Sequence, residues 1–472
     1  MLLYEQLADE LGVQVARGTL RAGDRLPSVR RLSEERGVSV ATVLSAYAIL
    51  EGRGLTESRP KSGYFVRAAK GPDAPVPSPP RRAPAAARIA SAADADDLIL
   101  AMSRGHGHVP LGTASIAPEL LPLRRLNTLL AAVAREGGGP GAAYEDLAGQ
   151  RPLRRQLARC AVRWGVALDE DDFITTAGAT EALNLAFGVV AKAGDIIAVE
   201  SPVYFGFLRL AEMHSFRVIE IPTDPRTGLD LDALDDAIRA NPVRAVLATP
   251  NFQNPLGARM PDENKERLVK MLGRRDIPLI EDDVYGDLSF DGTRPRPAKA
   301  FDDRGNVILC GTFSKTLAPG YRVGWIVPGR FQELVERRKF AQSVASASPT
   351  QMAIAELLGE GGYERHVRRL RRALASQSAR YRDAIAEAFP PGTKISQPQG
   401  GYVLWVELAS SVDAAAIQRQ ALDRGIAIAP GSIFSARRRF GHCLRISTGY
   451  PWSPRIERAI ATVGDLIARG ST

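Results

Sequence analysis

GTFSKTLAPGYRVGW, residues 311–325, is the stretch around which we interpret the fold. An apolar run at residues 307–310 precedes it and is typical of a buried strand. Burial disfavours the ammonium form of a lysine, so the amine of Lys315 is expected to be available as a nucleophile for a carbonyl. The same stretch holds two hydroxyls and a guanidinium that suit a phosphate: Thr312, Ser314 and Arg322.

A ligand with both an aldehyde and a phosphate fits this chemistry, and pyridoxal 5'-phosphate (PLP) is such a ligand. The alternative is a surface lysine and arginine that flank an ordinary loop. The rest of the chain has to decide between a cofactor site and a plain loop.

The composition is that of a globular protein with more than one domain. The chain has 472 residues, of which 45% are hydrophobic and 24% charged. No long uncharged apolar run and no secretory leader are visible, and three cysteines indicate a reducing compartment, so we expect a cytoplasmic protein. The five histidines lack the spacing of a metal site, and we expect no metal.

The net charge of +9 does not by itself indicate a nucleic-acid-binding segment. Residues 1–67 hold ten Lys and Arg against eight Asp and Glu. A DNA-binding function for this segment therefore has to rest on its pattern.

The N-terminal pattern predicts a winged helix-turn-helix. Apolar residues at helical spacing over residues 2–18 predict a first helix. Ser28 is placed to cap a helix over residues 29–36, and Gly37 to end it. Ser39 caps the second helix of the helix-turn-helix, which ends at Gly52 or Gly54. Residues 55–66 predict two short strands that form a wing.

The segments LYEQLADEL, GTLRAGDRLPSVRRLSEERGVSVATVLSAYAILEGRGL and SGYFV resemble the winged helix of the GntR family of bacterial regulators over residues 2–67. The resemblance implies binding to double-stranded DNA through Arg30, Ser39, Thr42, Lys61 and Gly63. Val40 and Leu44 stand where relatives often place polar residues, which implies base readout with fewer hydrogen bonds. The alternative is a helical subdomain without a role in DNA binding.

The remaining chain reads as a linker followed by an α/β domain. Residues 68–97 are rich in Pro and Ala without apolar periodicity, which predicts a partly extended linker between a DNA-binding domain at 1–67 and a larger domain at 98–472. From residue 98 strands and helices alternate.

Several polar residues of this domain follow predicted strands. Open α/β sheets build their sites at the carboxyl ends of strands, where we place Tyr204, Asn254 and the pair Asp282 and Tyr285. A strand, glycine turn and helix over residues 173–190 would direct the N–H groups of Ala179 and Thr180 at an anion.

Six motifs, TTAGATEAL, ESPVYFG, PNFQNPLG, EDDVY, FSKTLAPGYRVGW and LRIST, resemble fold-type-I PLP-dependent aminotransferases in order and spacing. The resemblance implies a large mixed-sheet domain with a smaller α+β domain. Joined to the winged helix, it makes the whole chain similar to the MocR subfamily of GntR regulators.

The aminotransferase resemblance also implies roles for single residues. Lys315 would hold PLP as an internal aldimine, and Asp282 would pair with the protonated pyridine nitrogen. Asn254 and Tyr285 would bond the ring 3'-oxygen, and Tyr204 would stack on the ring. Asp282 as a helix cap and Tyr204 as plain core are the alternatives.

Further implied contacts lie at the two ends of the ligand. The phosphate would be held by Ala179, Thr180, Thr312, Ser314 and Arg322. Tyr144 would add a contact from the neighbouring subunit, which implies a homodimer. Arg445 would clamp the α-carboxylate of a substrate beside Tyr402; a structural ion pair is the alternative for Arg445.

An arginine-rich helix at residues 364–374 is interpreted as an exposed face or a dimer surface, with DNA contact as the alternative. Two functions fit the whole chain. The first is a transcriptional regulator that senses an amino compound or PLP. The second is an active aminotransferase of an α-amino acid that carries a DNA-binding arm. Neither the effector, the operator, nor the direction of regulation follows from the sequence.

Overall fold

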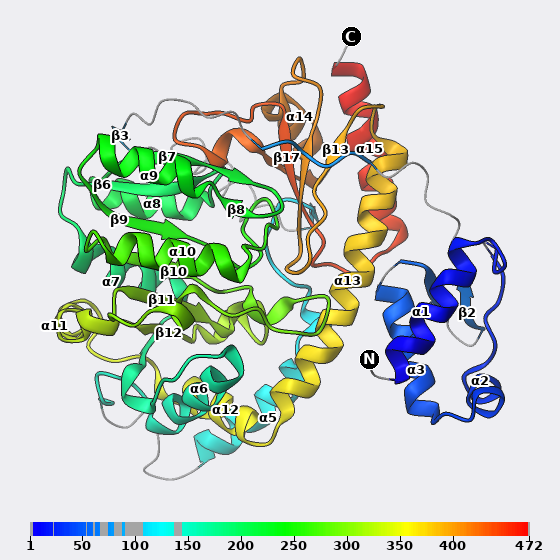
Figure 1. The fold of residues 1–472 in the computed structure, drawn as a ribbon, viewed down its shortest axis with the longest axis horizontal. Helices are drawn as coiled ribbons and strands as arrows, with labels where there is room; N and C mark the ends of the chain where they lie inside the picture. The colour runs from blue at the N-terminus through cyan, green and yellow to red at the C-terminus, as the bar shows by residue number, and fades with distance from the viewer. Residues whose placement is uncertain are drawn as a thin grey trace.

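The computed structural model describes residues 3–21, 23–52, 54–59, 62–66, 74–79, 87–89, 107–135 and 144–470. It consists of an N-terminal winged helix, a large domain around a mixed sheet and a smaller α+β domain (Figure 1). This is the fold class that the sequence predicts. In the described residues, no helix is long and apolar enough to cross a membrane.

The winged helix has the predicted elements: α1 (Leu3–Ala16), α2 (Val29–Arg36), α3 (Val40–Gly52), β1 (Thr56–Arg59) and β2 (Gly63–Val66). The predicted caps are confirmed, because the Ser28 hydroxyl accepts a hydrogen bond from the Arg31 N–H and Gly37 ends α2 with φ +62°. The three helices and β2 bury a small core that includes Leu11, Tyr47 and Val66. Strands β1 and β2 pair antiparallel and form the wing.

The large domain is built on one long sheet with the order β3-β7-β6-β9-β10-β11-β12-β5, to which β8 adds beside β7. The core pairs from β7 to β11 are parallel, whereas β12 runs antiparallel to both of its neighbours. The strands are β3 (Arg88–Ile89), β5 (Ile174–Thr176), β6 (Ile196–Ser201), β7 (Arg217–Asp224), β8 (Gly228–Leu229), β9 (Val243–Ala248), β10 (Leu279–Asp282), β11 (Val307–Thr312) and β12 (Gly324–Val327).

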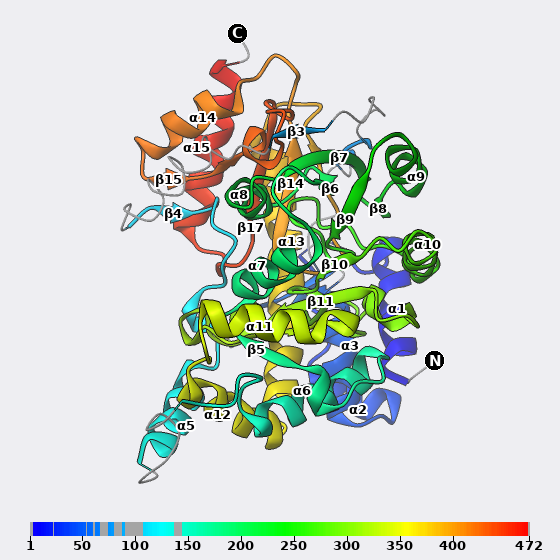
Figure 2. The same ribbon diagram turned by 90° about the vertical axis from the view of Figure 1, so that its left-hand side faces the viewer.

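Helices cover both faces of this sheet. Apolar residues of α7 and α8 pack on one face, and those of α9 and α10 pack on the other, so the strands between them are buried on both sides (Figure 2). The helices of the domain are α5 (Leu123–Arg135), α6 (Arg151–Trp164), α7 (Ala179–Val190), α8 (Phe205–Met213), α9 (Leu231–Ala240), α10 (Asp262–Gly273), α11 (Gln332–Gln342) and α12 (Ser348–Gly359).

The small domain packs α14, α15 and the C-terminal part of the long helix α13 (Gly362–Ala388) on a four-stranded sheet of order β13-β14-β17-β16. A separate parallel pair, β15 with β4, joins it to the segment that precedes the large domain. The elements are β4 (Val109–Pro110), β13 (Lys394–Ile395), β14 (Val403–Glu407), α14 (Ala414–Leu422), β15 (Ile426–Ala427), β16 (Ala429–Pro430), β17 (Cys443–Ser447) and α15 (Pro454–Gly470).

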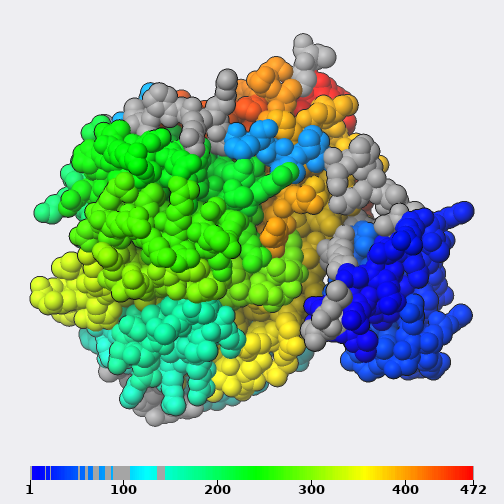
Figure 3. Space-filling view, viewed as in Figure 1, coloured from blue at the N-terminus to red at the C-terminus, as the bar shows by residue number. Residues whose placement is uncertain are grey.

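A single long helix, α13 (Gly362–Ala388), connects the parts of the molecule. Its inner face packs on the core that contains Tyr285 and Tyr402, and α3 of the winged helix packs on it from outside. Figures 1 and 2 both place the winged helix against α13, and Figure 3 shows it as a blue lobe at the edge of the molecule. The helix therefore touches both the DNA-binding domain and the core of the larger domain.

Parts of the predicted linker lie on the larger domain. Strand β3 pairs antiparallel with the edge strand β7, and the Pro75 carbonyl accepts a hydrogen bond from the Ile395 N–H at 2.8 Å. A segment without apolar periodicity can still pair its backbone N–H and C=O groups with the edge of a sheet. The Pro- and Ala-rich composition gave no sign of this pairing.

Candidate functional site

A cavity of about 360 Å³ lies where the carboxyl ends of the central strands meet the small domain. Eleven residues singled out from the sequence line it: Ala179, Thr180, Tyr204, Asn254, Asp282, Tyr285, Thr312, Ser314, Lys315, Arg322 and Arg445. They come from segments separated by up to 266 positions in the chain, and the fold brings them to one place.

Lys315 is presented by a short turn directly after β11. Its Nζ donates a hydrogen bond to the Ala114 carbonyl at 3.1 Å and lies 5.9 Å from the centre of the Tyr285 ring. Burial lowers the pKa of Lys315 to about 8, although the Asp282 carboxylate acts in the opposite direction. At pH 7 roughly a tenth of the molecules therefore carry a neutral amine at this position, far more than for a lysine with the ordinary pKa of about 10.4.

Asp282 and Asp283 stand next to each other but have different surroundings. Asp283 accepts hydrogen bonds from Asn251 and Arg294, which fix it in the structure. Asp282 lines the cavity, and its buried Oδ1 has no hydrogen-bond partner within the described chain. Burial, together with the charge of Asp283, raises the pKa of Asp282 to about 7. A carboxylate in this state calls for a cationic partner inside the cavity.

The end of the cavity next to α7 is suited to an anion. Gly178 caps the helix with φ +86°, so that the N–H groups of its first turn face the cavity. Arg322 donates to the Ala177 carbonyl at 2.7 Å and to the Ser314 hydroxyl at 3.4 Å, while Thr312 donates to Ser314 at 3.0 Å. The φ of +86° at position 178 favours glycine, and a Cβ there would also displace the Arg322 guanidinium, from which it would lie 2.4 Å.

Arg445 occupies the opposite side, on β17. It is 2% exposed and donates hydrogen bonds to Asn254 Oδ1 at 3.3 Å and to the Gly112 carbonyl. No carboxylate lies within ion-pair distance of it in the described residues, and its Nε has no partner there. The geometry therefore does not support the alternative of a structural ion pair, and leaves a buried guanidinium for an anionic group.

Tyr285, Asn254 and Tyr204 line the middle of the cavity. Asn254 Nδ2 donates to the Tyr285 hydroxyl at 3.4 Å, and burial raises the pKa of Tyr285 and of Tyr204. Tyr402 stands one layer behind the lining, where its ring packs edge-on against Tyr285 at 5.5 Å and its hydroxyl donates to the Ala114 carbonyl at 3.2 Å. Tyr402 thus supports the wall of the cavity.

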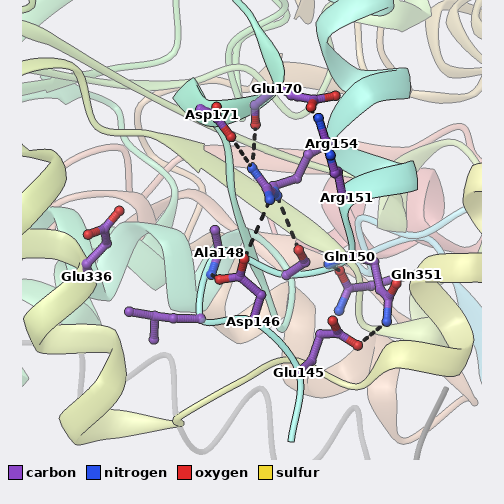
Figure 4. Close-up of polar contacts among 12 residues, drawn as sticks. Glu145, Asp146, Ala148, Gln150, Arg151, Arg154, Glu170, Asp171, Glu336 and Gln351 are labelled. Carbon is purple, nitrogen blue, oxygen red and sulfur yellow. Dashed lines mark hydrogen bonds and ion pairs between the residues drawn. The ribbon is translucent and has the colours of Figure 1, made fainter.

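Tyr144 lies outside the cavity and is 89% exposed. The segment that follows it is firmly held, because the buried Arg154 donates to the Gly149 carbonyl at 3.2 Å, the Glu170 carbonyl at 2.9 Å and Asp171 Oδ1 at 2.9 Å (Figure 4). The Gln150 N–H adds a bond to Gln351 Oε1 at 3.0 Å. An exposed tyrosine on a fixed segment is free to contact a second chain.

The DNA-contact residues lie on the surface of the winged helix. Arg30 and Ser39 are exposed and Thr42 is half-buried. The Ser39 hydroxyl accepts from the Thr42 N–H at 3.1 Å and so caps α3. Gly63 begins β2 with φ +102°, and Lys61 lies outside the described residues.

Sequence reasoning missed the segment Gly112, Thr113 and Ala114, which closes the cavity from the side of the small domain. A Cβ on Gly112 would lie 2.6 Å from the Ile428 carbonyl carbon, so only glycine fits at this position. The run of small residues was the one available signal. The apolar wall of Leu183, Phe205 and Ile433 was also missed, because apolar residues carry no chemical signature in a sequence.

Comparison with known proteins adds independent information. Residues 3–66 match the model of bacterial regulatory proteins of the gntR family, and residues 124–461 match aminotransferase class I and II. An uncharacterized HTH-type transcriptional regulator of Escherichia coli, YjiR, is 40% identical over 99% of both chains. Aromatic-amino-acid aminotransferase 1 of Thermococcus litoralis is 30% identical over 74% of this chain and 86% of its own.

Solved structures of aminotransferases also resemble this chain. The α-aminoadipate aminotransferase LysN of Thermus thermophilus, complexed with N-(5'-phosphopyridoxyl)-L-leucine, superimposes with a TM-score of 0.73 at 26% identity. The match covers 81% of this chain and 96% of that structure.

Proposed function

Because the chain belongs to the HTH-type transcriptional regulators that join a gntR-family domain to an aminotransferase class I and II domain, we propose that it regulates transcription through a PLP-dependent sensor of an amino compound. The observation that carries this proposal is the unpartnered Asp282 carboxylate, which shares one cavity with the neutral-prone amine of Lys315.

The residues of the cavity fit PLP end to end. Lys315 would hold the cofactor covalently, and Asp282 would supply the anion that a protonated pyridine nitrogen needs. The phosphate fits among Ser314, Arg322 and the first turn of α7, where donors converge. When bound, the cofactor supplies an electron sink for bonds at the α-carbon of an amino compound.

The protein's own groups would then bind and orient the effector. Arg445 offers two parallel donors to a carboxylate from a buried position, which selects compounds with a carboxylate near the amine. Because its pKa is lowered to about 8, Lys315 can take up or release a proton at Nζ near neutral pH. Asn254 and Tyr285, which share a hydrogen bond with each other, would bond the 3'-oxygen of the cofactor ring.

Helix α13 offers a physical route from the cavity to DNA. On its inner face, Tyr363 donates to Thr316 Oγ1 at 3.3 Å and His366 contacts the Thr316 carbonyl at 2.7 Å, one residue after Lys315. On its outer face α3 packs against it. An effector that moves the turn around Lys315 would thus act on the helix that holds the DNA-binding domain.

An active aminotransferase is the second candidate. The observation that favours it is that Lys315, Asp282 and Arg445 all meet in one cavity, so nothing needed for the chemistry is absent from the described lining. The two functions are compatible, because a half-reaction with an amino acid can itself be the signal. The exposed Tyr144 and its anchored segment support a homodimer in which this residue reaches the partner's phosphate site.

One titration tests both candidates. We expect the purified protein with PLP to change its visible spectrum on addition of one or a few of the twenty amino acids, and to change its affinity for its own upstream DNA in the same range. A spectral change without any effect on DNA binding supports the enzyme alone. Spectra and DNA affinity that stay constant across all amino acids exclude an amino-acid sensor.

Arg445→Lys and Arg445→Ala sharpen this test. Lysine keeps the charge but loses the planar pair of donors, and alanine loses both. We expect the effector concentration at half-response to rise for both variants and more for alanine, by about 2–5 kcal/mol in binding free energy. Equal responses of both variants and wild type would mean that the effector has no carboxylate at this position.

A further inference from the structure

Four arginines form a stripe along the first half of α13, which we call the α13 arginine stripe: Arg365, Arg368, Arg369 and Arg372. All four are exposed. Their spacing of three, four and seven residues places them on one face of the helix.

The arginine stripe has no acidic partners within the described chain. The contacts of its members are to the Glu360 carbonyl (from Arg365), to the Arg368 carbonyl (from Arg372) and to a ring nitrogen of His366 (from Arg369). Arg371 on the same helix differs, because it is partly buried and donates to the Asp287 and Gly292 carbonyls. Like charges on one helix face repel each other, so the stripe is a surface that an anionic partner would stabilise.

The stripe borders the winged helix. Helix α3 packs on α13, and Arg372 is near enough to Tyr64 on β2 that its positive charge acts against the rise in the Tyr64 pKa that burial causes. β2 belongs to the wing, so Arg372 of the stripe lies beside the part of the domain that is expected to approach DNA.

We infer that the α13 arginine stripe binds the phosphate backbone of the DNA that flanks the winged helix, so that the aminotransferase-like domain takes a direct part in DNA binding. This inference rests on the proposed DNA-binding function. Seven residues at about 1.5 Å each spread the guanidiniums over about 10 Å, which matches roughly three nucleotides at about 3.4 Å per step. Guanidinium groups bind phosphate with paired hydrogen bonds.

A second copy of the chain is a poorer partner for the stripe. A two-fold interface centred on the stripe would bring it against its own image, so that like charges would face each other. The duplex instead offers a row of negative charges beside the wing. The contacts would not read bases, so they raise affinity for all sequences equally.

The decisive experiment is the salt dependence of DNA binding by the full-length protein. Fluorescence anisotropy with a 40-base-pair duplex of arbitrary sequence, and with a duplex from the gene's own upstream region, gives log K against log [KCl]. Each lost phosphate contact reduces the magnitude of the slope by about 0.9. We expect Arg368→Gln/Arg369→Gln to reduce it by about 1.8 for each chain bound to the duplex, on both duplexes, and Arg368→Lys/Arg369→Lys to retain the slope.

Matched controls separate the stripe from general surface charge. Arg419 and Arg424 are exposed arginines on or next to α14, away from the winged helix in both ribbon views. Arg419→Gln/Arg424→Gln should leave the slope unchanged. Arg365→Gln/Arg372→Gln provides a second test of the stripe if the first variant folds poorly, as judged by circular dichroism.

The outcomes are distinguishable. Wild-type protein that binds neither duplex contradicts the proposed function itself. Wild-type binding with an unchanged slope in both stripe variants overturns this inference and leaves the proposed function intact. A loss of dimer in sedimentation without a change of slope would identify the stripe as a subunit surface and would also overturn it.

Discussion

The cavity around Lys315 and the outer surface of the winged helix are built in opposite ways. The cavity gathers residues from Gly112 to Arg445, and its charged groups Asp282 and Arg445 are buried. The winged helix is a contiguous segment whose outer side chains, including Val40 at 46% and Leu44 at 43% exposure, face solvent. The cavity depends on distant parts of the chain, and the winged helix depends on local caps and turns.

This difference determines how each region responds to substitution. A buried charged group has few alternatives for its partner, so its loss has a large and specific effect. An exposed residue on a short helix contributes small increments of affinity and stability. The effects of substitutions on rate and affinity should therefore be orders of magnitude larger in the cavity than in the winged helix.

The largest effect is expected for Lys315. Lys315→Ala should abolish the cofactor adduct that borohydride traps, because the variant has no amine at the end of β11. Peptide mass spectrometry of the reduced protein measures this. Lys270→Ala, on the surface of α10, is the matched control and should keep the adduct. A trapped adduct on another lysine in Lys315→Ala would contradict the assignment.

A smaller effect is expected for the carboxylate. Asp282→Asn removes the negative charge from the buried position and should slow any half-reaction with an amino acid by roughly 30-fold or more, the equivalent of about 2–5 kcal/mol. Rapid-mixing absorbance measures the rate. The neighbouring Asp283 already has protein partners, so a specific loss of rate in Asp282→Asn with retained cofactor would identify Asp282 as the ring partner. Unchanged rates would show that the ring nitrogen needs no anion here.

The same difference between distant and local contacts explains how much of each region could be predicted from the sequence. The helices, caps and wing were predictable because Ser28, Gly37 and Ser39 act on their own neighbours. The cavity residues were identified through motifs that resemble a known family. What escaped prediction were contacts without a local signal, such as Gly112 against Ile428, and the docking of α3 on α13, which depends on tertiary packing.

A smaller effect than that of either substitution is expected from pH, which changes the protonation of Lys315. Lys315 must be neutral to react, and burial lowers its pKa to about 8. The rate of PLP attachment to the cofactor-free protein should therefore rise roughly tenfold per pH unit below about 8 and level off above it. Stopped-flow absorbance from pH 6 to 10 measures this, with Nα-acetyl-lysine as the reference for PLP's own titration.

Asp282→Asn sharpens the pH experiment. The Asp282 carboxylate stabilises the ammonium form of Lys315, so its removal should move the midpoint of the rate profile below that of wild type. A wild-type profile that still rises to pH 10 would mean that Lys315 is solvated like an ordinary lysine, and the cavity would not differ from the surface in this respect.

The smallest expected effect lies in the winged helix. Ser39→Ala removes the cap that accepts the Thr42 N–H at the start of α3, which should destabilise this helix by about 1 kcal/mol. Ser45→Ala is the matched control, because Ser45 is exposed within the same helix and caps nothing. Hydrogen exchange of the α3 amides measures the opening, and we expect roughly fivefold faster exchange in Ser39→Ala alone, since 1.4 kcal/mol corresponds to about tenfold. If both serine variants behave alike, the order of α3 is set by its packing on α13, and the winged helix is then less independent of the larger domain than its local construction implies.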